Sequence, residues 1–415
     1  MAEAARADHG RLIALLAAAD GDLAGAEDAL ADAYEAALRH WDTDPPRYPQ
    51  AWLLTVARNR QRDRWKSAAH RRSVALDPQR PPAGEVGDAG DAGESLTDEE
   101  LPDRRLALLA VCAHPAIDRA AHTPLMLNTV LGFTAEQIGE ALAVPKATMA
   151  SRLVRAKRRI KQLGIRFEVP GPETLAPRLD AIREAVYGTF AIEWGTAERQ
   201  ARESLAQEAI HLAELLTELV PGDAESHGLA ALIEFSAARF AARGSDPSGR
   251  GFVPLAEQDP ALWDTDLIAK AEAHLRAGHR ARELGRFQLE AAIQAVHCAR
   301  RHDSAAGVPD WSALLQLHRA LVTVAPSLGA EVALAAVRAE CEGPEAGLDA
   351  LDVLAAKQSR ATGFQPWWAT RAHLLDRAAR PADAATAYRT AISLTTVTAE
   401  REYLQGRLAA VEADR

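Results

Sequence analysis

The chain has 415 residues, of which 48 are Lys or Arg and 58 are Asp or Glu, giving a net charge of −10. This length exceeds one ordinary hydrophobic core and predicts several domains, while 48% apolar residues exclude wholesale disorder. Aromatic residues are only 5% of the chain, strand-favouring residues are scarce, and three cysteines are widely spaced. We therefore expect an all-α fold in a reducing compartment, with no disulfide framework.

The charge of the first 170 residues is segregated along the chain. Residues 47–72 carry eight basic groups and one acidic group, and residues 146–166 carry eight basic groups and no acidic one. Between them, residues 77–103 carry nine acidic groups and one basic group in a stretch rich in Pro and Gly. The pattern predicts two basic helices joined by an acidic flexible linker, and it favours nucleic-acid contact despite the negative sum.

Two helices are predicted before this linker. On the helix expected from Asp22 to Trp41, one face carries mostly small and apolar side chains: Leu23, Ala26, Leu30, Ala33, Ala37 and Leu38. After a turn containing several prolines, residues 51–72 read as a second, very basic helix.

The segment after the linker ends in a predicted helix-turn-helix. Thr134 and Gln137 have the spacing of a capping box and start a short helix that ends before Pro145. The next helix runs to about Lys161, with one apolar face formed by Met149, Leu153, Ala156 and Ile160. Its opposite face is polar and cationic, which is typical of a recognition helix.

Ala-rich amphipathic segments recur from residue 169 to the end, separated by Pro- and Gly-bearing breaks. The spacing of Trp368, Ala372 and Leu375 and then of Ala384, Tyr388 and Ala391 fits a tetratricopeptide-like helical hairpin. No catalytic or phosphate-binding motif stands out, and Cys112 and His114 lack a second pair of metal ligands. We expect no enzymatic activity, no metal and no cofactor.

The first 165 residues resemble a bacterial extracytoplasmic-function sigma factor, through residues 26–41 and 51–65 for region 2 and 133–160 for region 4. Residues 254–268 and 285–297 resemble the subgroup of this family with a C-terminal tetratricopeptide-like extension. The resemblance implies four parts: region 2 over 1–76, the linker over 77–103, region 4 over 104–168 and the extension over 169–415. It also implies a cytoplasmic alternative sigma factor that binds core RNA polymerase and promoter DNA, without a membrane.

The residues that match the family's functional regions fall into three groups. For the −35 element, region 4 offers Lys146, Ala147, Thr148, Ser151, Arg152, Arg155, Lys157, Arg158 and Arg159. For the opened −10 element, region 2 offers Tyr48, Arg58, Arg60, Arg62, Arg64, Trp65 and Lys66. For docking on the polymerase, the earlier helix offers Asp28, Asp32 and Glu35.

A further polar set in the extension is a candidate regulatory pocket for a protein or a small molecule: Glu257, Gln258, Asp259, Trp263, Gln288 and His297. Helix caps and hydrogen bonds between helices are the alternative for this set, and solvated helix faces are the alternative for the charged groups. Two other functions stay open, a helix-turn-helix regulator that never meets polymerase and a tetratricopeptide adaptor. An enzyme within residues 171–415 has the least support.

Overall fold

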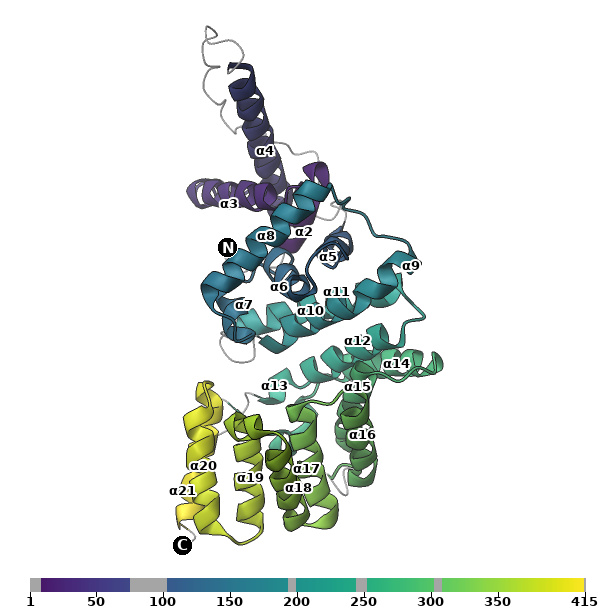
Figure 1. The fold of residues 1–415 in the computed structure, drawn as a ribbon, viewed down its shortest axis with the longest axis vertical. Helices are drawn as coiled ribbons and strands as arrows, with labels where there is room; N and C mark the ends of the chain where they lie inside the picture. Colours follow the sequence, from purple (N-terminus) through teal and green to yellow (C-terminus); the bar gives the residue numbers. More distant parts are fainter. Residues whose placement is uncertain (1–8, 75–102, 193–198, 244–251, 302–307, 414–415) are drawn as a thin grey trace. The chain divides into compact units, whose positions relative to one another are not determined.

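The computed structural model describes residues 9–74, 103–192, 199–243, 252–301 and 308–413. These residues form helices, turns and connecting segments without a strand, so the predicted all-α fold is confirmed. The chain divides into two compact units, one reaching to residue 192 together with 199–208, and the other from residue 209 onward (Figure 1). The predicted acidic linker lies outside the described residues except for Asp103.

The N-terminal unit starts with three helices, α2 (His9–Asp20), α3 (Leu23–His40) and α4 (Pro49–Val74). Asp22 caps α3 by accepting a hydrogen bond from the Gly25 amide at 3.2 Å. The predicted apolar face of α3 is buried, with one error, because Leu38 is 61% exposed. Successive residues lie 100° apart around the helix axis, so Leu38 points away from the buried face, whose last residue is Ala37.

This unit also contains α5 (Arg105–Cys112), α6 (Arg119–Thr129), α7 (Ala135–Ala141), α8 (Lys146–Leu163), the short α9 (Pro172–Leu175), α10 (Leu179–Ile192) and the first half of α11 (Arg199–Leu219). Helix α10 packs against α6, so the compact unit extends beyond the helix-turn-helix. Arg178, which directly precedes α10, donates from Nη1 to the carbonyl oxygen of Ala110 in α5 at 2.7 Å.

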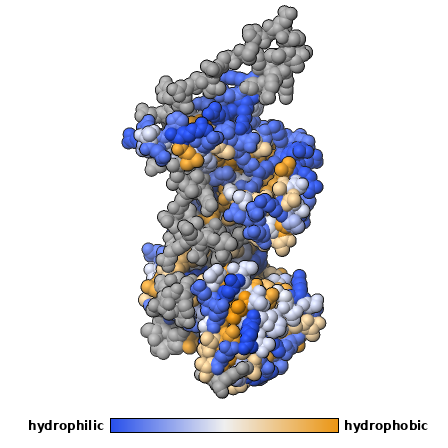
Figure 2. Space-filling view, turned by 90° about the vertical axis from the view of Figure 1, so that its left-hand side faces the viewer, coloured by the Kyte–Doolittle hydropathy of each residue, from blue (hydrophilic) through white to orange (hydrophobic). Residues whose placement is uncertain are grey.

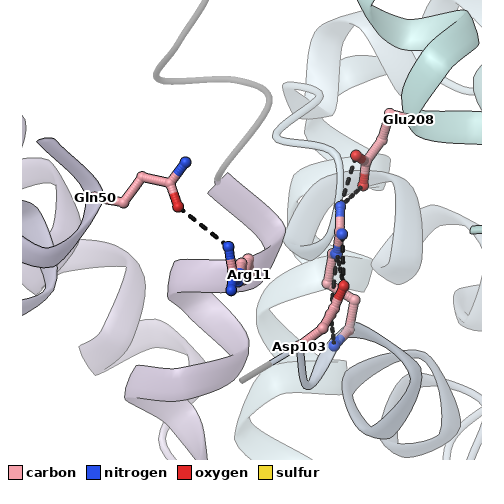
Figure 3. A network of polar contacts seen from close by, with 5 residues as sticks. Arg11, Gln50, Asp103 and Glu208 are labelled. Atoms are coloured by element: carbon pink, nitrogen blue, oxygen red, sulfur yellow. Dashed lines mark hydrogen bonds and ion pairs between the residues drawn. The ribbon is translucent and has the colours of Figure 1, made fainter. Parts of the chain in front are cut away.

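The buried Arg105 joins the start of α5 to another helix of the N-terminal unit, through contacts with Asp103 and Glu208, which are labelled in Figure 3. Arg105 donates from Nη1 to both carboxylate oxygens of Glu208 at 2.6 Å, and Glu208 belongs to α11 (Arg199–Leu219). Its Nη2 also donates to Asp103 at 2.6 Å. In the same figure, Arg11 of α2 reaches Gln50 of α4 at 3.3 Å. The bonds of Arg105 hold the start of α5 against α11, and the Arg11–Gln50 bond links α2 to α4.

The C-terminal unit is a succession of helices that pack mostly on their neighbours in sequence (Figure 1). Its α-helices are α12 (Ala224–Ala237), α13 (Phe240–Arg243), α14 (Thr265–Arg280), α15 (Arg286–Cys298), α16 (Trp311–Val324), α17 (Leu328–Glu342), α18 (Pro344–Lys357), α19 (Gln365–Arg377), α20 (Pro381–Leu394) and α21 (Thr398–Ala413). On the face shown in Figure 2, this unit mixes hydrophobic and hydrophilic residues, whereas the described N-terminal surface is mainly hydrophilic.

The hairpin predicted from large and small residues forms between α19 and α20. Ala372, Leu375, Ala384, Tyr388 and Ala391 are all buried in one cluster. The predicted Trp368 only packs against the cluster, while its neighbour Trp367 is buried and donates from Nε1 to the Leu351 carbonyl at 3.1 Å. Small side chains at the contact let the two helices approach closely.

Candidate nucleic-acid interface

The predicted helix-turn-helix is formed by α7 and α8. Thr134 accepts from the Gln137 amide at 3.2 Å, and the Gln137 side chain accepts from the Thr134 amide at 2.9 Å, so the capping box is confirmed. Helix α8 starts after Pro145 and stops at Gly164, whose φ of 60° is the left-handed conformation common at helix ends.

The approach of the turn to α7 requires a glycine in that helix. A Cβ atom on Gly139 would lie 2.6 Å from the carbonyl oxygen of Val144, which is backbone and has little freedom to move. The Val144 amide donates to the Gly139 carbonyl at 2.8 Å, and Ala143 takes a positive φ of 53°. This close approach fixes the angle between α7 and α8.

Helix α8 separates its buried and exposed faces as predicted. Met149, Leu153, Ala156 and Ile160 are buried. The solvent-exposed members of the predicted set are Lys146, Ala147, Thr148, Ser151, Arg155, Arg158 and Arg159. Arg152 is half-buried and donates to the Ala120 carbonyl at 3.2 Å, and Lys146 pairs with Glu136 at 2.7 Å. Cations free to meet phosphates therefore line most of the outer face.

Lys157 differs from the cations on the outer face, because its ammonium group forms an ion pair inside the N-terminal unit. Its Nζ lies 2.6 Å from Glu27 of α3 and 2.6 Å from the Asn128 side-chain oxygen. Lys161, one turn later, pairs with Asp22 of the same partner helix. Helix α8 therefore packs against α3 through a half-buried ion pair that no local sequence pattern signals, since 130 residues separate the partners.

The basic residues of α4 fall on two faces. Arg58, Arg62, Trp65 and Lys66 share one exposed face at helical spacing, and the charge of Arg62 adds to burial in lowering the pKa of Arg58. Arg64 lies on another face and pairs with Asp28 at 3.2 Å and with Asp32 at 2.8 Å. The structure thus joins a predicted DNA contact to two predicted polymerase contacts. Half-buried Arg60 follows the spacing of Arg64.

Two remaining predicted contacts of this region have local partners. Glu35 pairs with Arg39 one turn along α3. Tyr48 is half-buried beneath the guanidinium of Arg47, which lies 5.3 Å from the ring centroid. The indole of Trp65 is 63% exposed, which suits it for stacking on an unpaired base.

The members of the predicted regulatory set of the extension make several different contacts, and three of them lie near Arg300. Gln258 and Trp263 are buried around Arg300, which donates to the Gln258 carbonyl at 3.4 Å. His297 lies 6.5 Å from the Trp311 ring, and burial together with the charges of Arg239 and Arg300 lowers its pKa. Gln288 lines a cavity of about 630 Å³ between α14, α15 and α16. The other two members have local roles: Asp259 accepts from the Ala261 amide at 2.9 Å, and Glu257 accepts from the Tyr403 hydroxyl at 3.4 Å.

Cys112 and His114 occupy separate environments. Cys112 is buried beside the Thr129 hydroxyl at 3.4 Å, and burial raises its thiol pKa to about 12. His114 is half-buried and accepts from the Ala116 amide at 3.1 Å. Across the described ranges, no three His, Cys, Asp or Glu side chains are grouped for a metal.

Comparison with known proteins supports the assignment of the N-terminal part. Residues 5–71 match sigma-70 region 2, and residues 178–279 match a family of unknown function, DUF6596. An uncharacterized protein of Rhizobium meliloti (strain 1021) is 33% identical over 387 residues, covering 92% of this chain and 89% of that protein. The chain belongs to the same family as this Rhizobium protein. No solved structure matches it.

The region 2 match covers the three helices that carry the exposed basic face, Trp65 and the Asp28–Arg64–Asp32 contact. It supports a sigma factor with a role in transcription initiation, and implies binding to core RNA polymerase and promoter DNA. Sigma-70 proteins are non-enzymatic transcription factors. None of the helices within the described residues has the length and apolar character needed to cross a membrane.

Proposed function

We propose that this protein is an alternative sigma factor of the extracytoplasmic-function type, which directs RNA polymerase to specific promoters under the control of its C-terminal helical unit. The observation that carries the proposal is the combination of a region 2 match with a separate helix-turn-helix whose outer face is exposed and cationic. A regulator that never meets polymerase has no use for the region 2 helices.

In this proposal, the two DNA-binding faces have different tasks. The first turns of α8 carry Lys146, Thr148 and Ser151, which reach base edges of the −35 element in the major groove. Arg155, Arg158 and Arg159 contact phosphates and give affinity that falls with salt. On α4, the face with Arg58, Arg62 and Lys66 neutralises the backbone of the opened −10 element, and Trp65 stacks on an unpaired base.

Simultaneous contact with both promoter elements requires the N-terminal unit to open. The names of the elements place them about 25 base pairs apart, which is roughly 85 Å of DNA at 3.4 Å per base pair. Helix α8 is only about 27 Å long, and it packs on α3 through Lys157 and Glu27. The contact between these helices therefore describes a closed form that breaks when polymerase and promoter are bound.

The experiment is reconstitution with purified core RNA polymerase. Co-elution of the full chain with core polymerase in gel filtration, followed by transcripts from a defined class of promoters, is the expected result. Absence of both would overturn the proposal. Specific DNA binding without polymerase binding would favour the free-standing regulator, and neither activity would favour the adaptor.

A further inference from the structure

Two arginines are buried close together in the C-terminal unit, and no carboxylate of the described residues pairs with either of them. Arg239, just after α12, is 7% exposed, and Arg300, in the helical turn after α15, is 9% exposed. The Asp264 amide donates to the Ala238 carbonyl at 2.9 Å, which brings the neighbours of Trp263 and Arg239 together, and Arg300 lies against the Trp263 ring. The charge of Arg300 also adds to burial in lowering the pKa of Arg239. Neither group forms an ion pair with any described residue.

The groups that accept hydrogen bonds from these arginines are all neutral. Arg239 donates to the Phe235 carbonyl at 3.3 Å and to the Gln294 side-chain oxygen at 2.5 Å. Arg300 donates from Nη2 to the Gln258 carbonyl at 3.4 Å, and its Cζ lies 5.5 Å from the centre of the Trp263 ring. The buried Nε of Arg300 and Nε1 of Trp263 have no acceptor within the described structure.

The surrounding titratable groups do not supply the missing charge. Burial, followed by the charges of Arg239, Arg300 and His318, lowers the pKa of His297 to about 4, so this ring is neutral. Cys298 is the one group that raises the pKa of both arginines. A single thiol supplies at most one negative charge against two positive charges, and an uncompensated buried cation is unfavourable.

We propose that Arg239, Arg300 and the indole N–H of Trp263 form a binding site for a compact phosphoryl group, either inorganic phosphate or the phosphate of a small ester. The planar fork of a guanidinium matches two phosphate oxygens, and the unused donors provide the remaining hydrogen bonds. The small residual exposure of both arginines suits a small anion and excludes a macromolecule. The site does not depend on the sigma assignment, and it would give the C-terminal unit a chemical signal to detect.

The test is isothermal titration of the full chain with inorganic phosphate and, separately, with glycerol phosphate, at constant ionic strength set by sodium chloride. The wild-type chain is expected to bind, and Arg239→Gln and Arg300→Gln are each expected to weaken binding about tenfold or more. Arg389→Gln is the matched control, because Arg389 is an exposed arginine paired with Glu412 in the same unit. Tighter binding of the ester would identify a phosphorylated small molecule as the ligand, and tighter binding of phosphate would identify the free ion.

Thermal melts without and with phosphate separate this proposal from a purely structural role of Arg300. Arg300→Gln removes an uncompensated buried charge, so its midpoint should not fall below that of the wild type, and added phosphate should no longer raise it. Arg300→Lys keeps the charge but loses the fork, and should also bind more weakly. No binding by the wild type, or unchanged binding by the Gln variants, would overturn the proposal.

Discussion

At the scale of single residues, the Lys157–Glu27 pair is the clearest electrostatic feature of the N-terminal unit. The Lys157 side chain is 12% exposed and that of Glu27 is 25% exposed. Burial raises the pKa of Glu27 more than Lys157 lowers it. Because the pKa is raised in the folded state, the contribution of Glu27 to stability is fully present below the ordinary carboxyl pKa and is lost as pH rises through the folded value.

Lys157→Gln should therefore destabilise the protein, and by more at neutral than at acidic pH. The variant removes the charge and hydrogen bond that hold down the Glu27 pKa, so this pKa rises further. We expect a loss of about 1–3 kcal/mol in the free energy of unfolding near neutral pH, measured by urea unfolding. Lys161→Gln is the control, since the Lys161 side chain is 59% exposed and its loss should cost less than about 1 kcal/mol. Equal losses for the two variants, or a loss that does not change with pH, would contradict this account.

A second effect of pH on stability is expected from Glu234. This carboxyl group is fully buried on α12, neither oxygen accepts a hydrogen bond, and burial followed by the charge of Glu214 raises its pKa to about 8. Its stabilising contribution, present below the unfolded carboxyl pKa, is lost as pH rises toward 8. Glu234→Gln should therefore flatten the fall of melting temperature over this range, whereas Glu345→Gln, at an exposed position on α18, should leave it unchanged. A profile that Glu234→Gln does not alter would refute the prediction.

At the scale of elements, the angle between α7 and α8 depends on one backbone contact. Gly139→Ala places a Cβ atom 2.6 Å from the Val144 carbonyl oxygen, so the turn must open. We expect a loss of about 1–3 kcal/mol in unfolding free energy and weaker DNA binding. Gly171→Ala is the control because a Cβ there meets nothing within 4 Å. Urea unfolding and a mobility-shift assay measure both effects, and wild-type values for Gly139→Ala would show that the turn tolerates a side chain.

Local patterns predicted the helix-turn-helix well, and long-range contacts limited the rest. The capping box and the four buried residues of α8 follow from spacing within one helix or one turn. In contrast, no pattern could pair Lys157 with Glu27, because side chains 130 residues apart meet only after folding. The same holds for Arg239 and Arg300, which are 61 residues apart in the sequence. Leu38 was misplaced because periodicity does not show where a buried face ends.

At the scale of the whole molecule, opening of the N-terminal unit should control DNA binding. Glu27→Gln removes the anion that holds α8 on α3 and leaves every cation of α8 in place. We expect the free variant to bind promoter DNA more tightly than the wild type, by roughly twofold to tenfold, because less energy is needed to open the unit. Asp42→Asn is the control, because it removes the same charge from an exposed loop. A mobility-shift titration measures this, and equal affinities for Glu27→Gln and Asp42→Asn would rule out the closed form as a restraint.

The sigma assignment itself is tested most directly by run-off transcription with purified core polymerase and a pool of genomic promoter fragments. The account predicts transcripts whose start sites share sequences near −10 and −35, and it predicts that Arg155→Ala reduces them. Arg166→Ala, an exposed arginine just beyond α8, should not. Transcripts without shared upstream sequences, or none above the level of core polymerase alone, would contradict it.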